Sequence, residues 1–165
     1  MGVKMIVVPL VDNGSLETIE QSDILIGFLL QKKDFFAQNN IKIVFESDFN
    51  PSKLASFIAR LPTKEFGINY DIGNSAANGF DPTEEFDRYG SRVYNVHVKD
   101  RELNGTTVSL NSGNADFKTV FYQLSKQNYQ GNFILQTARA EQGNHSEVLR
   151  EYVNMTLKWM EESFL

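Results

Sequence analysis

The chain has 165 residues, of which 41% are hydrophobic and thirteen are phenylalanine, so it is long and apolar enough to bury one core. Its net charge of −5 leaves no basic excess for neutralising a nucleic-acid backbone, and the lack of cysteine excludes disulfides and thiolate metal sites. The first apolar run is broken by Pro9 and Asp12, which makes it too short for a membrane span or a signal peptide. We therefore expect a cytoplasmic protein that binds neither nucleic acid nor membrane.

Five short runs of apolar and β-branched residues alternate with segments that have helical spacing. The predicted strands are residues 5–11, 41–46, 66–72, 93–98 and 132–137. The predicted helices are residues 22–40, 51–61, 82–90, 115–129 and 145–164. Because parallel neighbours need a helical crossover, this alternation predicts an α/β fold of five parallel βα units. No Gly/Ser-rich linker interrupts the pattern, so residues 1–165 are expected to form a single domain.

Four of the predicted strands carry a polar side chain late in the strand, namely Glu46, Asp71, His97 and Gln136. In a parallel α/β sheet or barrel these strand ends lie at one face, where ligands bind. Two carboxylates, an imidazole and an amide oxygen at a common rim suit a divalent cation such as Mn²⁺, Mg²⁺ or Zn²⁺. Each residue alone has a simpler explanation as a helix cap, a loop residue or a structural histidine. Four in succession favour the shared metal site, because otherwise each placement needs its own reason.

The runs "VFESDFNP", "YDIGNSAANGFDP", "HVKDRELNG" and "ILQTAR" resemble the second part of the sugar phosphate isomerase/epimerase superfamily. These are the xylose isomerase-like TIM barrels, which also include apurinic endonucleases and inosose dehydratases. The resemblance extends from Met5 to about Trp159 and implies a partial (βα)8 barrel made of strands 4 to 8. It also implies that Glu46, Asp71 and His97 are metal ligands on the fifth, sixth and seventh strands. The fourth ligand of the family is usually a glutamate on the eighth strand, where this chain has Gln136.

The same resemblance implies proton transfer next to a carbonyl, with a metal ion stabilising an enediolate-like intermediate. Gln136 can offer its carbonyl oxygen to an ion but cannot accept a proton near neutral pH, so Glu46 remains the obvious base. A single base suits an isomerase or a lyase better than an epimerase that needs one base on each face of the carbon. The expected substrate is a sugar or a sugar phosphate.

Polar residues beside these strand ends suit a polyhydroxylated or anionic ligand. Asn74 follows Asp71 by three residues and could reach a sugar hydroxyl, while Lys99, Arg101 and Arg139 could each clamp a phosphate or carboxylate. Alternatives stay open at every position. Asn74 is equally typical of a turn, and each of the three cations is equally typical of a surface ion pair, including one between Lys99 and its neighbour Asp100.

The chain is shorter than a complete barrel. A barrel of about 250 residues uses about 31 residues per βα unit, so five units account for this chain and three are missing. The first and last strands would then each have an unpaired edge. A homodimer, a separate N-terminal half-barrel and a truncated chain all agree with this count.

Two functions from different classes therefore stay open. The chain is either the metal-bearing part of an isomerase that acts once the barrel is complete, or a non-catalytic half-barrel that keeps metal or carbohydrate binding. An apurinic endonuclease is disfavoured, because the resemblance implies a three-metal cluster with many histidines for that chemistry and this chain has two.

Overall fold

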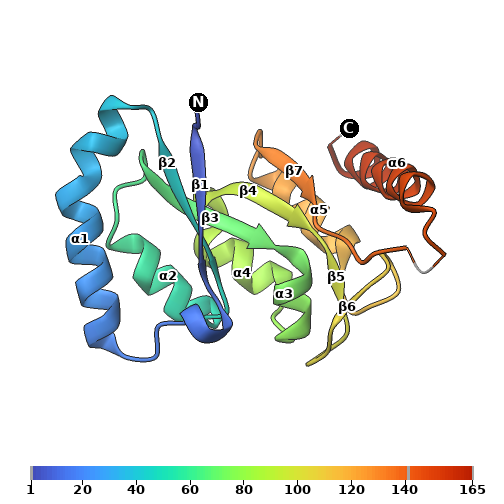
Figure 1. Ribbon diagram of the computed structural model, residues 1–165, viewed down its shortest axis with the longest axis horizontal. Helices are drawn as coiled ribbons and strands as arrows, with labels where there is room; N and C mark the ends of the chain where they lie inside the picture. Colours follow the sequence, from blue (N-terminus) through green and yellow to red (C-terminus); the bar gives the residue numbers. More distant parts are fainter. Residues whose placement is uncertain (1, 141, 165) are drawn as a thin grey trace.

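The computed structural model describes residues 2–140 and 142–164, and five parallel strands form one sheet within them (Figure 1). The strand order is β1-β2-β3-β4-β7, and every neighbouring pair is parallel. The strands are β1 Met5–Leu10, β2 Lys42–Ser47, β3 Phe66–Asp71, β4 Val93–Val98 and β7 Asn132–Leu135. The prediction of about five parallel βα units in a partial barrel is confirmed.

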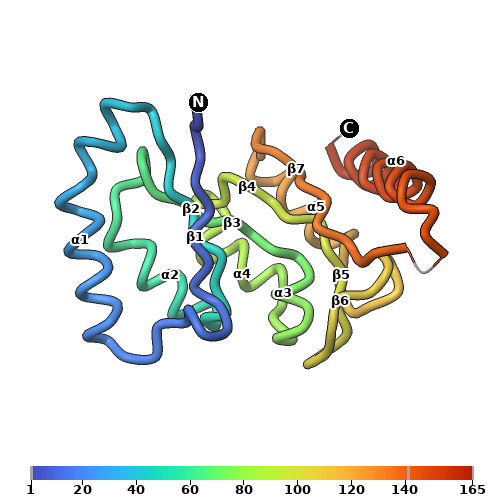
Figure 2. Tube along the Cα trace, viewed as in Figure 1, coloured from blue at the N-terminus to red at the C-terminus, as the bar shows by residue number. Residues whose placement is uncertain are grey.

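Helices connect consecutive strands, as parallel pairing requires. In the view of Figure 1, α2, α4 and α5 lie behind the sheet, whereas α1 and α6 lie at its two sides. Figure 2 traces the chain from β1 at one edge to β7 and α6 at the other. The helices are α1 Ile19–Gln38, α2 Pro51–Ala59, α3 Ile72–Ala77, α4 Pro82–Tyr89, α5 Phe117–Lys126 and α6 His145–Phe164, with 3-10 turns η1 Asp12–Gly14 and η2 Gly90–Arg92. Among the described residues, no helix is both long enough and apolar enough to cross a bilayer.

The hydrophobic core lies between the sheet and its helices. Every residue of β3 is buried, and Phe45, Phe66, Phe86 and Phe121 are among the largest side chains with almost no exposed surface. Burial of a phenylalanine stabilises a fold by roughly 1.5–3 kcal/mol relative to exposure. The central strands are therefore held firmly, which fixes the side chains at their carboxyl ends.

Several element bounds differ from the sequence predictions by one to three residues, and the differences described next concern the ends of the strands and the loops that follow them. The strand predicted over residues 66–72 ends at Asp71, because Asp71 caps α3, a helix that was not predicted. The strand predicted over residues 132–137 ends at Leu135, before Gln136, because its neighbour β4 ends at Val98. A small antiparallel pair, β5 Asp100–Arg101 with β6 Thr107–Val108, was not predicted either.

Candidate metal centre

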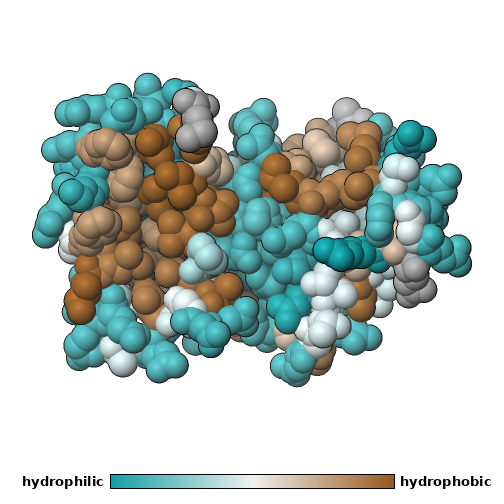
Figure 3. Space-filling view, viewed as in Figure 1, coloured by the Kyte–Doolittle hydropathy of each residue, from teal (hydrophilic) through white to brown (hydrophobic). Residues whose placement is uncertain are grey.

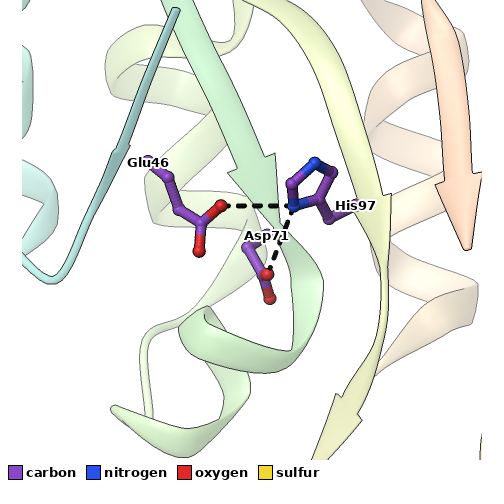
Figure 4. A group of neighbouring side chains, drawn as sticks. All are labelled: Glu46, Asp71 and His97. Carbon is purple, nitrogen blue, oxygen red and sulfur yellow. Dashed lines mark ion pairs between the residues drawn. The ribbon is translucent and has the colours of Figure 1, made fainter. Parts of the chain in front are cut away.

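Glu46, Asp71 and His97 meet at the carboxyl ends of three adjacent strands, β2, β3 and β4 (Figure 4). One ligand atom from each residue lies within 4.8 Å of the others. His97 Nδ1 is 3.2 Å from Glu46 Oε2 and 3.6 Å from Asp71 Oδ2. Ligand atoms bound at about 2.1 Å to one ion stand roughly 3 to 3.5 Å apart, so this spacing suits a divalent cation. Their role as metal ligands stays a prediction.

Strand register brings these side chains to the same height. Asp71 lies opposite His97 in the β3–β4 pair, and Glu46 lies near the end of β2. Side chains alternate between the two faces of a strand, so ligands at corresponding heights on neighbouring strands project to the same side. The rigid sheet therefore preorganises the cluster.

The two carboxylate oxygens of Asp71 have different partners. Oδ1 accepts a hydrogen bond from the backbone N–H of Asn74 at 2.8 Å and caps α3. Oδ2 faces His97 Nδ1 and lies 3.5 Å from Lys99 Nζ. The helix-cap explanation and the ligand explanation are thus compatible, because each uses its own oxygen.

Both carboxylate oxygens of Glu46 accept hydrogen bonds from side-chain amides. Asn69 Nδ2 donates to Oε2 at 3.0 Å, and Asn74 Nδ2 donates to Oε1 at 2.8 Å. Asn74 lies in α3, so the alternative of a turn residue does not hold for it. Glu46 is therefore held between one amide from β3 and one from α3.

Hydrogen bonds to the side-chain oxygens of Asn69 and Asn74 fix the orientation of the two amides. Asn95 Nδ2 donates to Asn69 Oδ1 at 2.5 Å. Lys99 and Arg101 both donate to Asn74 Oδ1, at 3.1 Å and 2.9 Å. An amide oxygen that already accepts a hydrogen bond leaves only the NH₂ group to face Glu46. The groups that donate to the two amide oxygens therefore also hold the Glu46 carboxylate in place, because they keep both NH₂ groups directed at it.

Asn69 and Asn95 belong to the hydrogen-bond network around Glu46 but were not among the predicted site residues. Asn69 precedes Asp71 by two residues, and Asn95 precedes His97 by two, so each amide lies on the strand face that carries the ligand. Both amides are buried, with 2% and 4% of their surfaces exposed. Their spacing of two residues from Asp71 and His97 was the signal in the sequence that placed them on the same strand face as the predicted ligands.

The electrostatics of the cluster act on His97. Burial lowers the pKa of His97, but hydrogen bonds to Asp71 and Glu46 and the charges of both carboxylates outweigh that effect. The result is a rise in the pKa of His97 from 6.5 to about 9. The imidazole of the metal-free protein is therefore protonated at neutral pH, and an ion would have to displace that proton.

A polar cavity of about 540 Å³ opens beside the cluster. Glu46, Asn74, Lys99 and Arg101 form part of its wall, and Asp12 and Asp48 also line it. This volume lies within the range of small-molecule sites. Three of the four predicted substrate-binding residues thus border one cavity together with a predicted metal ligand.

Gln136 and Arg139 follow the end of β7. Both side chains are exposed, and the backbone N–H of Gln136 donates to Val98 O at 3.1 Å. Arg139 lines a different depression, next to Thr137, His145 and Leu149. Metal binding by Gln136 and substrate binding by Arg139 stay predictions.

Asp100 organises the loop that follows β4. It is fully buried, and its carboxylate accepts hydrogen bonds from the backbone N–H groups of Gly113 at 2.9 Å and Ala115 at 3.1 Å. Lys99 turns instead toward Asp71 and Asn74. The alternative of a Lys99–Asp100 ion pair is therefore not what the described residues form.

A family model described as xylose isomerase-like TIM barrel matches residues 1–161. The chain belongs to the xylose isomerase-like TIM barrel family. The resemblance read from the sequence is thereby confirmed.

Among similar proteins, an inosose dehydratase of Geobacillus thermodenitrificans is 24% identical over 94% of this chain and 66% of its own length. The solved structure of the IOLI protein with a bound zinc atom matches 99% of this chain and 65% of its own, with a TM-score of 0.80 and 16% identity. A D-allulose 3-epimerase of Methylomonas sp. in complex with D-allulose matches 84% of this chain and 56% of its own, with a TM-score of 0.67 and 14% identity. The chain thus spans less than two thirds of the length of each.

Proposed function

We propose that this chain carries the metal-binding part of a sugar or sugar-phosphate isomerase, or of a lyase that shares its proton-transfer step. The observation that carries the proposal is the convergence of Glu46, Asp71 and His97 at the edge of a polar cavity. In this proposal Glu46 accepts a proton from a carbon next to the substrate carbonyl. The spacing of the cluster and the names of the similar proteins support it.

The donor set fits a divalent cation. Two carboxylates and one imidazole provide oxygen and nitrogen ligands that suit Mn²⁺, Mg²⁺ or Zn²⁺, and IOLI was solved with zinc. A bound cation supplies Lewis-acid stabilisation for oxygens next to the reacting carbon. The residues that would hold it are Glu46, Asp71 and His97, with Gln136 as a further oxygen ligand in the complete rim.

The two oxygens of Glu46 suit two tasks. Oε2 lies on the side of His97, whereas Oε1 lies on the side of Asn74, whose neighbours Lys99 and Arg101 line the cavity. A carboxylate that accepts a proton must reach it at hydrogen-bond distance, and the cavity side offers that access. We therefore assign proton transfer to Oε1.

The cavity wall suits a polyhydroxylated ligand. Amide and carboxylate groups can bind hydroxyls, and Lys99 and Arg101 can pair with an anionic substituent. The names of the inosose dehydratase and of the epimerase complex with D-allulose point to the same class of small molecule. The proposed substrate is therefore a sugar or a sugar phosphate.

One observation favours a second candidate, a half-barrel that binds metal or carbohydrate without catalysis. Gln136, where the family resemblance implies a glutamate, is exposed and provides no second carboxylate base. This candidate shares the metal site with the first but lacks the proton transfer.

Proton transfer can be measured before the natural substrate is known. The Mn²⁺-loaded protein, alone and with a polypeptide that completes the barrel, is incubated in deuterium oxide with a panel of ketoses, their phosphates and an inosose. NMR then follows deuterium entry next to the carbonyl. We expect exchange with at least one compound and its loss in Glu46→Gln, which keeps an oxygen ligand but cannot accept the proton.

Asn132→Leu is the matched control, because Asn132 is exposed at the start of β7, away from the strand ends that form the cluster. It should exchange like the parent protein. Metal binding without exchange in every condition would reject catalysis and leave the half-barrel candidate. Exchange that survives in Glu46→Gln would reject Glu46 as the base.

A further inference from the structure

Glu85 is a buried carboxylate that the proposed chemistry does not use. It lies in α4, and 2% of its surface is exposed. None of the ion pairs formed by the described residues includes it. Three hydroxyl groups donate to it instead: Oε2 accepts hydrogen bonds from Tyr70 at 2.7 Å and Ser75 at 2.5 Å, and Oε1 accepts one from Tyr89 at 2.6 Å. A buried carboxylate without a cation depends on such donors, because they replace the water that it has lost.

Fold stability alone gives little reason for this arrangement. Replacing both partners of a buried polar contact by apolar groups of the same shape can be nearly neutral or even stabilising. A buried polar network whose members are all paired instead selects one geometry, because a shift leaves a polar group without its partner. The neighbours of Glu85 therefore indicate what that geometry serves.

The two donors to Glu85 Oε2 are neighbours of metal-site residues in the chain. Tyr70 immediately precedes Asp71 in β3, and Ser75 immediately follows Asn74 in α3. The hydroxyl of Tyr70 also donates to Ser75 Oγ at 3.3 Å. One carboxylate of α4 is thus bound to both β3 and α3, next to the residues that form the site.

Glu85 and the metal cluster lie on opposite faces of the sheet. The ring of Tyr70 packs against Phe86 of α4 with centroids 5.0 Å apart, and successive side chains of a strand alternate in direction, so Asp71 points away from α4. In Figure 1 α4 lies behind the sheet; Figure 3 shows the front face in the same view, with hydrophilic surface in its middle between hydrophobic surface over α1 and β1 and beside β7. Ser75, Glu85 and Asp71 line one small cavity of about 20 Å³, roughly the space of one water molecule. The network therefore lies directly behind the cluster.

We propose that Glu85 is a positioning residue for the metal centre, because its contacts hold helix α3 against the end of strand β3. This role rests on the metal site of the proposed function. Asp71 Oδ1 accepts a hydrogen bond from the backbone N–H of Asn74, so a shift of α3 against β3 breaks this cap and turns Oδ2 away from the cluster. The same shift moves the Asn74 amide that donates to the carboxylate of the proposed base.

Three hydroxyl deletions around one acceptor separate positioning from general stability. Tyr70→Phe and Ser75→Ala each remove a contact to β3 or α3. Tyr89→Phe is the matched control, because Tyr89 lies in α4 four residues after Glu85 and its hydrogen bond connects this helix only to itself. Each variant loses one O–H donor to Glu85, so urea unfolding should show similar losses of stability.

Calorimetric titration with Mn²⁺ measures the effect on the site. We expect roughly three- to tenfold weaker binding for Tyr70→Phe and Ser75→Ala, which is less than the 10- to 100-fold typical of a direct partner of a metal ligand. Tyr89→Phe should bind within about twofold of the parent protein. Tyr70→Phe keeps the packed ring, so it decides the matter if Ser75→Ala does not fold.

The backbone amide of Asn74 gives a second readout that needs no metal ion. Its N–H donates to Asp71 Oδ1, so its hydrogen exchange, followed by NMR in the metal-free protein, should be faster in the first two variants and unchanged in the control. Equal metal affinities in all three variants, or unchanged Asn74 exchange throughout, would overturn the role of Glu85 while the metal centre stands. A parent protein that binds no Mn²⁺ would reject the proposed metal centre and this role with it.

Discussion

Asn69 donates a side-chain hydrogen bond to Glu46 Oε2 at 3.0 Å from the neighbouring strand. Its own oxygen is occupied by Asn95 Nδ2, so the amide cannot turn around without losing that bond. The partner of a metal-ligating carboxylate typically contributes 10- to 100-fold to metal affinity, because it fixes the orientation of the ligand. Asn69 should therefore affect metal binding without touching the ion.

We predict that Asn69→Leu weakens Mn²⁺ or Zn²⁺ binding by roughly 10- to 100-fold, measured by calorimetric titration. The same substitution at exposed Asn132 should leave affinity unchanged. Urea unfolding of both metal-free variants separates loss of the fold from loss of the site. If Asn69→Leu and the parent protein were both folded and bound the metal ion with equal affinity, Asn69 would have no role in metal binding.

Asp71 offers a way to separate capping from metal binding. Asn caps helices about as well as Asp, whereas Ala costs roughly 0.5–2 kcal/mol at such a position. We predict that Asp71→Asn and Asp71→Ala both lose high-affinity metal binding, because neither keeps the charged Oδ2. Chemical denaturation should show Asp71→Ala to be less stable than Asp71→Asn by about 1 kcal/mol. If Asp71→Asn still bound the metal ion tightly, metal binding would not require the negative charge of Asp71.

The raised pKa of His97 predicts how stability depends on pH. Burial lowers this pKa, but Asp71 and Glu46 stabilise the protonated ring and raise it from 6.5 to about 9 in the folded metal-free protein. Because the pKa of His97 is higher in the folded state than in the unfolded state, protonated His97 stabilises the fold. This contribution to the free energy of unfolding is complete below pH 6.5 and is lost as pH rises through about 9. The contribution is on the order of 3 kcal/mol at most.

Urea unfolding with a chelator at pH 6, 7.5 and 9.5 measures this loss. We expect the free energy of unfolding to fall across the series in the parent protein and to fall less in His97→Gln, which does not titrate. Metal binding should change in the opposite sense, because it becomes tighter as the competing proton is removed. If the free energy of unfolding changed with pH equally in the parent protein and in His97→Gln, His97 would not be the cause of the pH dependence.

Much of the fold was predictable because its main signals are local. The run Val93–Val98 and the helix His145–Phe164 have the predicted bounds, since each has a clear period and turn or cap residues beside it. The helix α3 was missed because it has six residues and depends on one capping contact from Asp71. The pair β5–β6 was missed because two-residue strands carry no period at all.

The site was predictable where the strand end alone decides the position. Glu46, Asp71 and His97 are placed by the shared direction of parallel strands, which a sequence reveals. The contacts of Asn69 and Asn95 depend on the register between β3 and β4, where a bulge shifts the pairing near Asn69. Register between parallel strands is set by tertiary packing rather than by a short turn, so it was not readable from the sequence.

Two glycines give opposite predictions for the same substitution. A Cβ at Gly113 would come within 2.5 Å of Arg101 O and even closer to the carboxylate of Asp100, so Gly113→Ala must displace the loop that Asp100 holds. Such overpacking typically costs about 1–3 kcal/mol. A Cβ at Gly27, inside α1, would meet nothing within 4 Å, and alanine favours a helix over glycine by roughly 0.8–1 kcal/mol. Thermal unfolding should therefore show a lower melting temperature for Gly113→Ala than for the parent protein and a higher one for Gly27→Ala. A Gly113→Ala variant as stable as the parent would mean that the loop relaxes around the added methyl group and that the Asp100 contacts do not hold it in place.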